Sequence, residues 1–103
     1  MTASPADLAV ERIHTEMALL LELVPHSKWY LFGSILRDKR PVNDIDVLVV
    51  CPNDPDCEKI RFGLAAACSE FPIHLLLMTR AEEAEVKFIE GECAVQIGCP
   101  THT

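Results

Sequence analysis

The chain has 103 residues, half of them hydrophobic, so we expect one domain with an apolar core over residues 1–103. Its formal net charge of −7 argues against direct binding to a nucleic-acid backbone, which needs clustered lysine and arginine. No apolar run is long enough to span a membrane, and no signal peptide opens the chain, so a cytoplasmic location is expected.

The cysteines do not predict a disulfide framework. Their number is odd, no C-x-x-C pair occurs, and a cytosolic domain with a large apolar core does not need cross-links. Cys68 and Cys93 fit apolar positions and are expected in the core. A zinc site formed by Cys51 and Cys57 is the less favoured alternative to two unliganded thiols.

The first predicted element is a helix from Pro5 to about Leu23. Ser4 suits the capping position and Pro5 the first helical position, and Pro25 ends the pattern. Hydrophobic residues recur near the helical period at Leu8, Ile13, Met17, Leu20, Leu21 and Val24. Such a face packs against a sheet or binds a partner protein; core packing is favoured.

A buried strand, a sharp turn and a short helix are predicted next. Residues 29–32, Trp-Tyr-Leu-Phe, form a bulky apolar run. Gly33 ends the run and lets the backbone turn tightly and a ligand approach it closely. Ser34 follows at the start of the short helix 35–37, where free N–H groups and the positive end of the dipole suit a phosphate.

The following strand begins with two acids. Asp44 and Asp46 alternate with Ile45 and Val47, so both carboxylates point to one face, about 6.5 Å apart along the strand. Carboxylates held this close repel each other unless a cation lies between them, and Mg²⁺ binds such groups together with substrate phosphates. A phosphate-binding turn beside an acid pair is the minimum equipment for metal-assisted nucleotidyl transfer.

This pattern resembles a known signature. Phe32-Gly33-Ser34, separated by residues 35–43 from Asp44-Ile45-Asp46, is similar to the motif of the polymerase-β-like nucleotidyltransferase superfamily. The short chain resembles its minimal members, which often act as antitoxins in bacterial toxin–antitoxin pairs. Arg37 matches an arginine that is common after the Gly-Ser turn, and Asn43 a small polar residue before the first aspartate. Asp38 departs from a frequent glycine.

Three further elements complete the chain. Residues 51–56, rich in proline and polar residues, lead into a helix with Pro55 near its first position and its end before Phe71. The strand 73–78 is nearly all apolar and is therefore expected at the centre of the sheet. A capping box at residues 79–82 opens a helix that continues to Gly91, and a short strand at 93–97 follows.

The alternation of helices and strands is compatible with a parallel, doubly wound α/β sheet. The resemblance instead implies an α+β fold: a mixed sheet of about four strands with helices mainly on one face. We favour the mixed sheet because the link between the Gly-Ser turn and the acid pair is too short for an ordinary crossover helix.

One position departs from the superfamily pattern. Enzymes of the superfamily carry a third carboxylate on the strand next to the one that holds the acid pair. In this chain the corresponding strand is 73–78, and His74 is its only polar residue and lies where that carboxylate is expected. Imidazole is a poor ligand for Mg²⁺, although a neutral histidine can act as a general base near pH 7. The alternative is a histidine packed in the core.

The resemblance implies a nucleotidyltransferase with catalytic Asp44, Asp46 and His74, with nucleotide bound at Gly33, Ser34 and Arg37. Mg²⁺ or Mn²⁺ would bind at the two aspartates, and ATP is the expected substrate. An alternative is a catalytically degenerate binding module that acts through a partner protein such as a toxin subunit. A structural domain without nucleotide is the third hypothesis.

Overall fold

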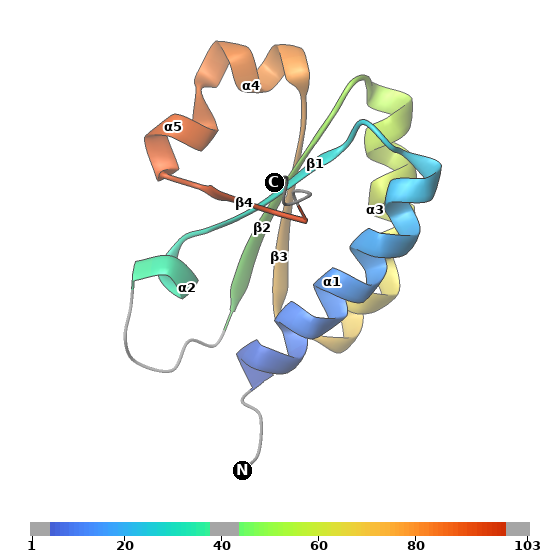
Figure 1. Cartoon of the computed structure of the whole chain (residues 1–103), viewed down its shortest axis with the longest axis vertical. Helices are drawn as coiled ribbons and strands as arrows, with labels where there is room; N and C mark the ends of the chain where they lie inside the picture. Colours follow the sequence, from blue (N-terminus) through green and yellow to red (C-terminus); the bar gives the residue numbers. More distant parts are fainter. Residues whose placement is uncertain (1–4, 38–43, 99–103) are drawn as a thin grey trace, which may run out of the picture.

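The computed structural model describes residues 5–37 and 44–98 (Figure 1). Most boundaries agree with the sequence prediction to within a residue or two. The elements in chain order are α1 (Pro5–Leu23), β1 (Lys28–Phe32), α2 (Ser34–Arg37), β2 (Ile45–Cys51), α3 (Asp54–Glu70), β3 (Ile73–Thr79), α4 (Arg80–Val86), α5 (Phe88–Glu92) and β4 (Val95–Ile97).

The strands form one mixed sheet, as predicted. Their order is β3-β2-β1-β4; β1 is antiparallel to both β2 and β4, whereas β2 and β3 are parallel. The long helix α3 joins the parallel pair, since a parallel connection must cross over the sheet. The doubly wound alternative is therefore wrong for this chain.

The two long helices α1 and α3 cover one face of the sheet (Figure 1). Ile13 and Leu20 of α1 and Ile60 and Leu64 of α3 are buried against alternate residues of β2, such as Val47. The apolar stripe of α1 thus packs in the core, as favoured, except for Leu8, which is 45 % exposed. None of the described helices is both long and apolar enough to cross a membrane.

The opposite face carries a smaller apolar cluster. Tyr30, Leu48 and Val50 form it, and α5 contributes Phe88, whose ring meets the edge of Phe32 at a centroid distance of 4.9 Å. Figure 1 shows α4 and α5 lying away from the α1–α3 layer. The larger helices are therefore on one face, which confirms that part of the prediction.

Three expectations about the last third of the chain are wrong. β3 lies at an edge of the sheet and not at its centre. Its apolar sequence reflects contacts on both faces: Leu75 and Leu77 pack against the α1–α3 core, and Leu76 and Met78 against the smaller cluster. A strand that packs on both faces is apolar throughout, whether it lies at the edge or in the centre of the sheet. The apolar sequence alone therefore does not show how many neighbouring strands it has.

The expected helix 80–91 is broken at Lys87. This residue has φ 53° and ends α4, with its N–H bonded to the carbonyl of Glu83. The break redirects the chain so that Phe88 reaches Phe32. Cys93, expected in the core, is exposed and caps α5 with φ 54°.

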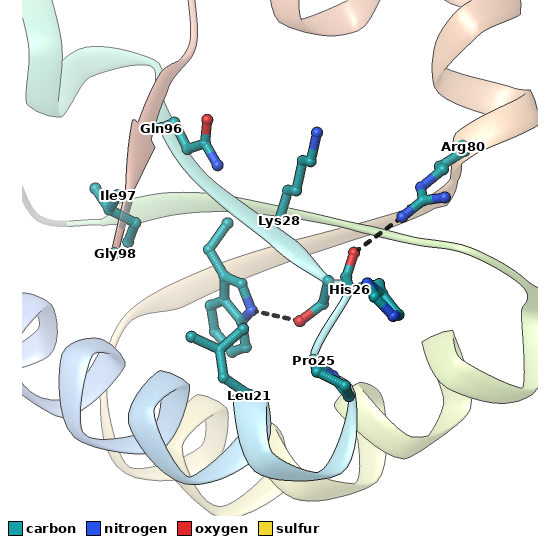
Figure 2. A pocket seen from close by; sticks show the side chains of 10 residues that line it. Leu21, Pro25, His26, Lys28, Arg80, Gln96, Ile97 and Gly98 are labelled. Carbon is teal, nitrogen blue, oxygen red and sulfur yellow. Dashed lines mark hydrogen bonds between the residues drawn. The ribbon is translucent and has the colours of Figure 1, made fainter. Parts of the chain in front are cut away.

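Ser27 fixes the turn between α1 and β1 (Figure 2). Its buried hydroxyl donates to the carbonyl of Val24 at 2.8 Å and accepts from the indole nitrogen of Trp29 at 3.0 Å. Trp29 is among the largest fully buried side chains, so its N–H has no access to water. The turn and the core are thus joined by one hydroxyl.

Ser27→Ala should destabilise the domain by about 1–3 kcal/mol, because it leaves the buried indole N–H without an acceptor. Urea unfolding followed by tryptophan fluorescence measures the change. Ser69→Ala, at an exposed position of α3, is the matched control and should change stability by only a few tenths of a kcal/mol. Equal stabilities of the two variants would contradict the role of Ser27.

Candidate active site

The acid pair lies at the start of the central strand β2. Ile45, Val47 and Val49 are fully buried in the α1–α3 core. Alternation along the strand then turns Asp46 toward the opposite face, and Asp44, two residues earlier, has the same orientation. The side chains of Asp44 and Asp46 are 50 % and 23 % exposed, so both reach solvent.

Gly33 touches the same carboxylate from the neighbouring strand. Phe32 pairs with Asp46 in the β1–β2 ladder, and Gly33 follows Phe32 with φ 80°. A Cβ built on Gly33 would collide with the carboxylate of Asp46. We expected the missing side chain to make room for a phosphate; in the structure it first makes room for Asp46.

The other nucleotide-binding candidates are only partly described. Ser34 is exposed and begins α2, directly after Gly33. Arg37 ends α2, and its side chain lies outside the described part of the structure, as do Asp38 and Asn43. The structure therefore places Gly33 beside Asp46, and the predicted nucleotide-binding roles of Gly33, Ser34 and Arg37 stay predictions.

His74 joins the acid pair from β3. It is the register partner of Asp46, and its Nδ1 lies 3.2 Å from Asp46 Oδ1. Its Nε2 lies 4.0 Å from Asp44 Oδ2, and 68 % of the side chain is exposed. The imidazole thus lies on the carboxylate face, as predicted, and the alternative of a core histidine is wrong.

The donor set fits Mg²⁺ only in part. Two solvent-accessible carboxylates supply the hard oxygen ligands that the ion prefers. The third group is an imidazole, and residues 5–37 and 44–98 contain no group of three or more metal-binding side chains arranged to hold an ion. The remaining ligands would have to be water and substrate oxygens.

The cysteine pair gives no metal centre in the described residues. Cys51 and Cys57 are buried and unlinked, and burial is the main cause that raises the pKa of Cys51 to about 12 and the pKa of Cys57 above its usual value. Residues 5–37 and 44–98 offer no third histidine, cysteine or carboxylate that would complete a metal site with these two thiols. The less favoured zinc hypothesis has no support.

A cleft elsewhere on the molecule was not foreseen. It measures about 340 Å³ and lies where β1 begins, between Leu21, Lys28, Arg80 and Gln96 (Figure 2). Lys28 pairs with Val50, at the opposite end of the β1–β2 ladder from Asp46, so this cleft is separate from the acid pair. The residues that line it come from segments far apart in the sequence, so no local sequence motif could have predicted it.

The geometry defines a class of site: an acid pair on the open face of a central strand, beside a Gly-Ser turn. Comparisons add little. No protein-family model and no curated protein matches the chain. A Sulfolobus solfataricus protein described as a "putative nucleotidyltransferase" is similar in structure, with 19 % identity and a TM-score of 0.49 over 92 % of this chain and 87 % of that one. These values are too low to bear on function.

Gly33→Ala should destabilise the domain by at least about 1–2 kcal/mol, because alanine is strained at positive φ and its Cβ displaces the Asp46 carboxylate. Chemical denaturation measures the loss. Gly91→Ala is the control, since a Cβ there meets nothing within 4 Å.

The same change made in an Asp46→Ala background should cost less, because the collision has been removed. The two substitutions would then be coupled in a double-mutant cycle. Strict additivity would mean that Gly33 and Asp46 do not touch.

Proposed function

We propose that this domain is a nucleotidyltransferase of the polymerase-β-like type. It binds a nucleoside triphosphate, ATP first among candidates, and transfers a nucleoside monophosphate to a hydroxyl of a protein or other acceptor. The observation that carries the proposal is the convergence of Asp44, Asp46 and His74 on one solvent-accessible face, beside the turn at Gly33. The signature in the sequence and the mixed sheet are consistent with it.

In this proposal Asp44 and Asp46 hold Mg²⁺ or Mn²⁺ jointly with the triphosphate. The bound ion would neutralise phosphate charge and stabilise the charge that develops on the leaving pyrophosphate. The low number of protein ligands predicts weak metal binding without nucleotide. The turn at Gly33 and Ser34 offers main-chain N–H groups close to the acid pair.

In this proposal His74 acts as the general base. When its Nδ1–H donates to Asp46, its Nε2 is left to accept a proton. The acceptor hydroxyl would lose its proton to this nitrogen while its oxygen bonds to the α-phosphorus. The bond from that phosphorus to the β-phosphate oxygen breaks, and pyrophosphate leaves.

A second candidate function rests on the same histidine. The third acid is absent, and the imidazole already contacts both aspartates, so a chain that kept the fold and lost the chemistry would look the same. Such a binding module would act by pairing with another protein, for which a toxin-like subunit is the candidate. Transfer of labelled nucleotide to such a partner separates the two functions.

Asp44→Ala/Asp46→Ala should abolish Mg²⁺-dependent ATP binding, because both proposed metal ligands are lost. Isothermal titration with ATP in the presence and absence of Mg²⁺ measures it. Glu11→Ala/Glu22→Ala removes the same charge from exposed positions of α1 and should leave binding intact. Unchanged ATP binding by the aspartate variant would refute the site.

The acceptor reaction is tested with ATP labelled at the α-phosphate. Wild-type protein should transfer label to a partner protein or to itself, and the aspartate variant should not. ATP binding by the wild type without any transfer of label would favour the binding module over the enzyme.

His74→Asp should make the domain more dependent on Mg²⁺. The new carboxylate would stand at an exposed position beside two others, so their repulsion should lower the melting temperature until Mg²⁺ is added. Thermal melts with and without Mg²⁺ measure this, with the uncharged His74→Asn as control. A His74→Asp protein as indifferent to Mg²⁺ as His74→Asn would contradict a metal site on this face.

A further inference from the structure

The outer edge of β3 is open within the part of the chain that the structure describes. β3 pairs with β2 on one side, and the sheet order leaves its other side without a neighbouring strand (Figure 1). It is seven residues long, whereas β4 at the opposite edge has three. Open edges of that length are normally interrupted by a charged residue, a proline or a bulge. The strand Ile-His-Leu-Leu-Leu-Met-Thr has neither proline nor lysine.

The ladder with β2 determines which backbone groups face outward. Ile45 donates its N–H to the carbonyl of Pro72 at 2.9 Å, so the peptide groups of Pro72 point toward β2. Peptide groups alternate in direction along a strand, and those of Leu75 and Leu77 therefore point away from the sheet. Each residue presents one N–H and one C=O along the open edge.

At each end of this edge, the outward N–H group is already hydrogen-bonded within the chain. The N–H of Ile73 donates to the carbonyl of Phe71 at 2.8 Å, and the N–H of Thr79 donates to the carboxylate of Glu82 at 2.8 Å. The unpaired section of the edge is thus centred on Leu76, with Leu75 and Leu77 on either side.

We propose that two copies of this chain associate through β3, with the two strands antiparallel about a two-fold axis at Leu76. In this register Leu75 of each copy lies opposite Leu77 of the other, and the outward N–H and C=O groups of both residues are all paired. Moving the axis to Leu75 or Leu77 would oppose one of these residues to Ile73 or Thr79, whose N–H groups are already bonded. The edge is therefore complementary to itself in one register.

The side chains around the axis also suit a second copy. Leu75, Leu76 and Leu77 are only partly buried in one chain, and pairing would cover them on both faces of the joined sheet. A hollow of about 430 Å³ lies beside Leu76 and Met78 and is bordered by Glu82 and Glu85 of α4. The register places His74 of the second copy opposite Met78, on the same face of the joined sheet.

The symmetry of the contact limits it to a dimer. A two-fold interface uses the same surface on both copies and closes on itself, whereas head-to-tail pairing of β3 with β4 of another copy would build larger rings or open filaments. The three-residue β4 also gives a much shorter ladder than β3.

Sedimentation equilibrium of the whole chain should give a mass that rises with concentration toward twice 11.5 kDa. Leu77→Pro removes an outward N–H from each copy and leaves the β2–β3 ladder intact, so the dissociation constant should rise at least about tenfold. Phe62→Ser is the matched control: it removes an apolar side chain that is 87 % exposed on α3 and should leave dimerisation unchanged. Circular dichroism checks that both variants fold.

Amide hydrogen exchange tests the same interface without mutation. The N–H groups of Leu75 and Leu77 should exchange more slowly as the concentration of wild-type protein rises, because a larger fraction of the chains is then dimeric. A mass that stays at 11.5 kDa up to millimolar concentration would overturn the proposal. So would a dimer that dissociates in Phe62→Ser but not in Leu77→Pro, because the contact would then involve the exposed side of α3 around Phe62.

Discussion

The central strand β2 has strict two-faced alternation, and the rest of the domain depends on it. Residues 47–51 are buried, and their side chains divide between the core under α1 and α3 and the smaller cluster under α5. Because side chains alternate with a period of two, the residues that bury themselves under the long helices decide which residues point the other way. Asp46 reaches the open face because Ile45 and Val47 are fully buried on the other.

The pairing of β2 with its two neighbouring strands brings the other residues of the site next to Asp46. β1 brings Gly33 against Asp46, and β3 brings His74 to the same carboxylate at 3.2 Å. The side chains of Asp44, Asp46 and His74 therefore meet because of where the strands place their backbones. α5 covers the adjoining part of this face through Phe88, which packs on Phe32, the register partner of Asp46. The carboxylates of Asp44 and Asp46 still reach solvent.

Sequence patterns predicted these features to different degrees. Alternation predicted the common face of Asp44 and Asp46, because local geometry determines it. His74 was expected beside them because the resemblance places an acid at that position, whereas alternation alone left a core histidine open. The short link between Gly33 and Asp44 correctly excluded an all-parallel sheet. The shared face of the two aspartates and the type of sheet could be predicted because both depend on residues that are close together in the sequence.

The errors came from tertiary context. The edge position of β3 was missed because contacts on both faces make a strand apolar whether or not it has two neighbours. The break at Lys87 was missed because lysine rarely adopts positive φ; packing of Phe88 on Phe32 accompanies it. The contact between Gly33 and Asp46 joins two strands, and the sequence shows only that a glycine is present.

The placement of acids on β2 also protects the fold against mispairing. If β2 slipped by one residue against its neighbours, the valines would turn outward and the carboxylate of Asp46 would enter the dry layer beneath α1 and α3. An unpaired carboxylate there would be costly, because burial removes its hydration and Ser27 is the one buried polar or charged residue among residues 5–37 and 44–98. The two aspartates therefore disfavour this alternative register, independently of any chemistry that they perform.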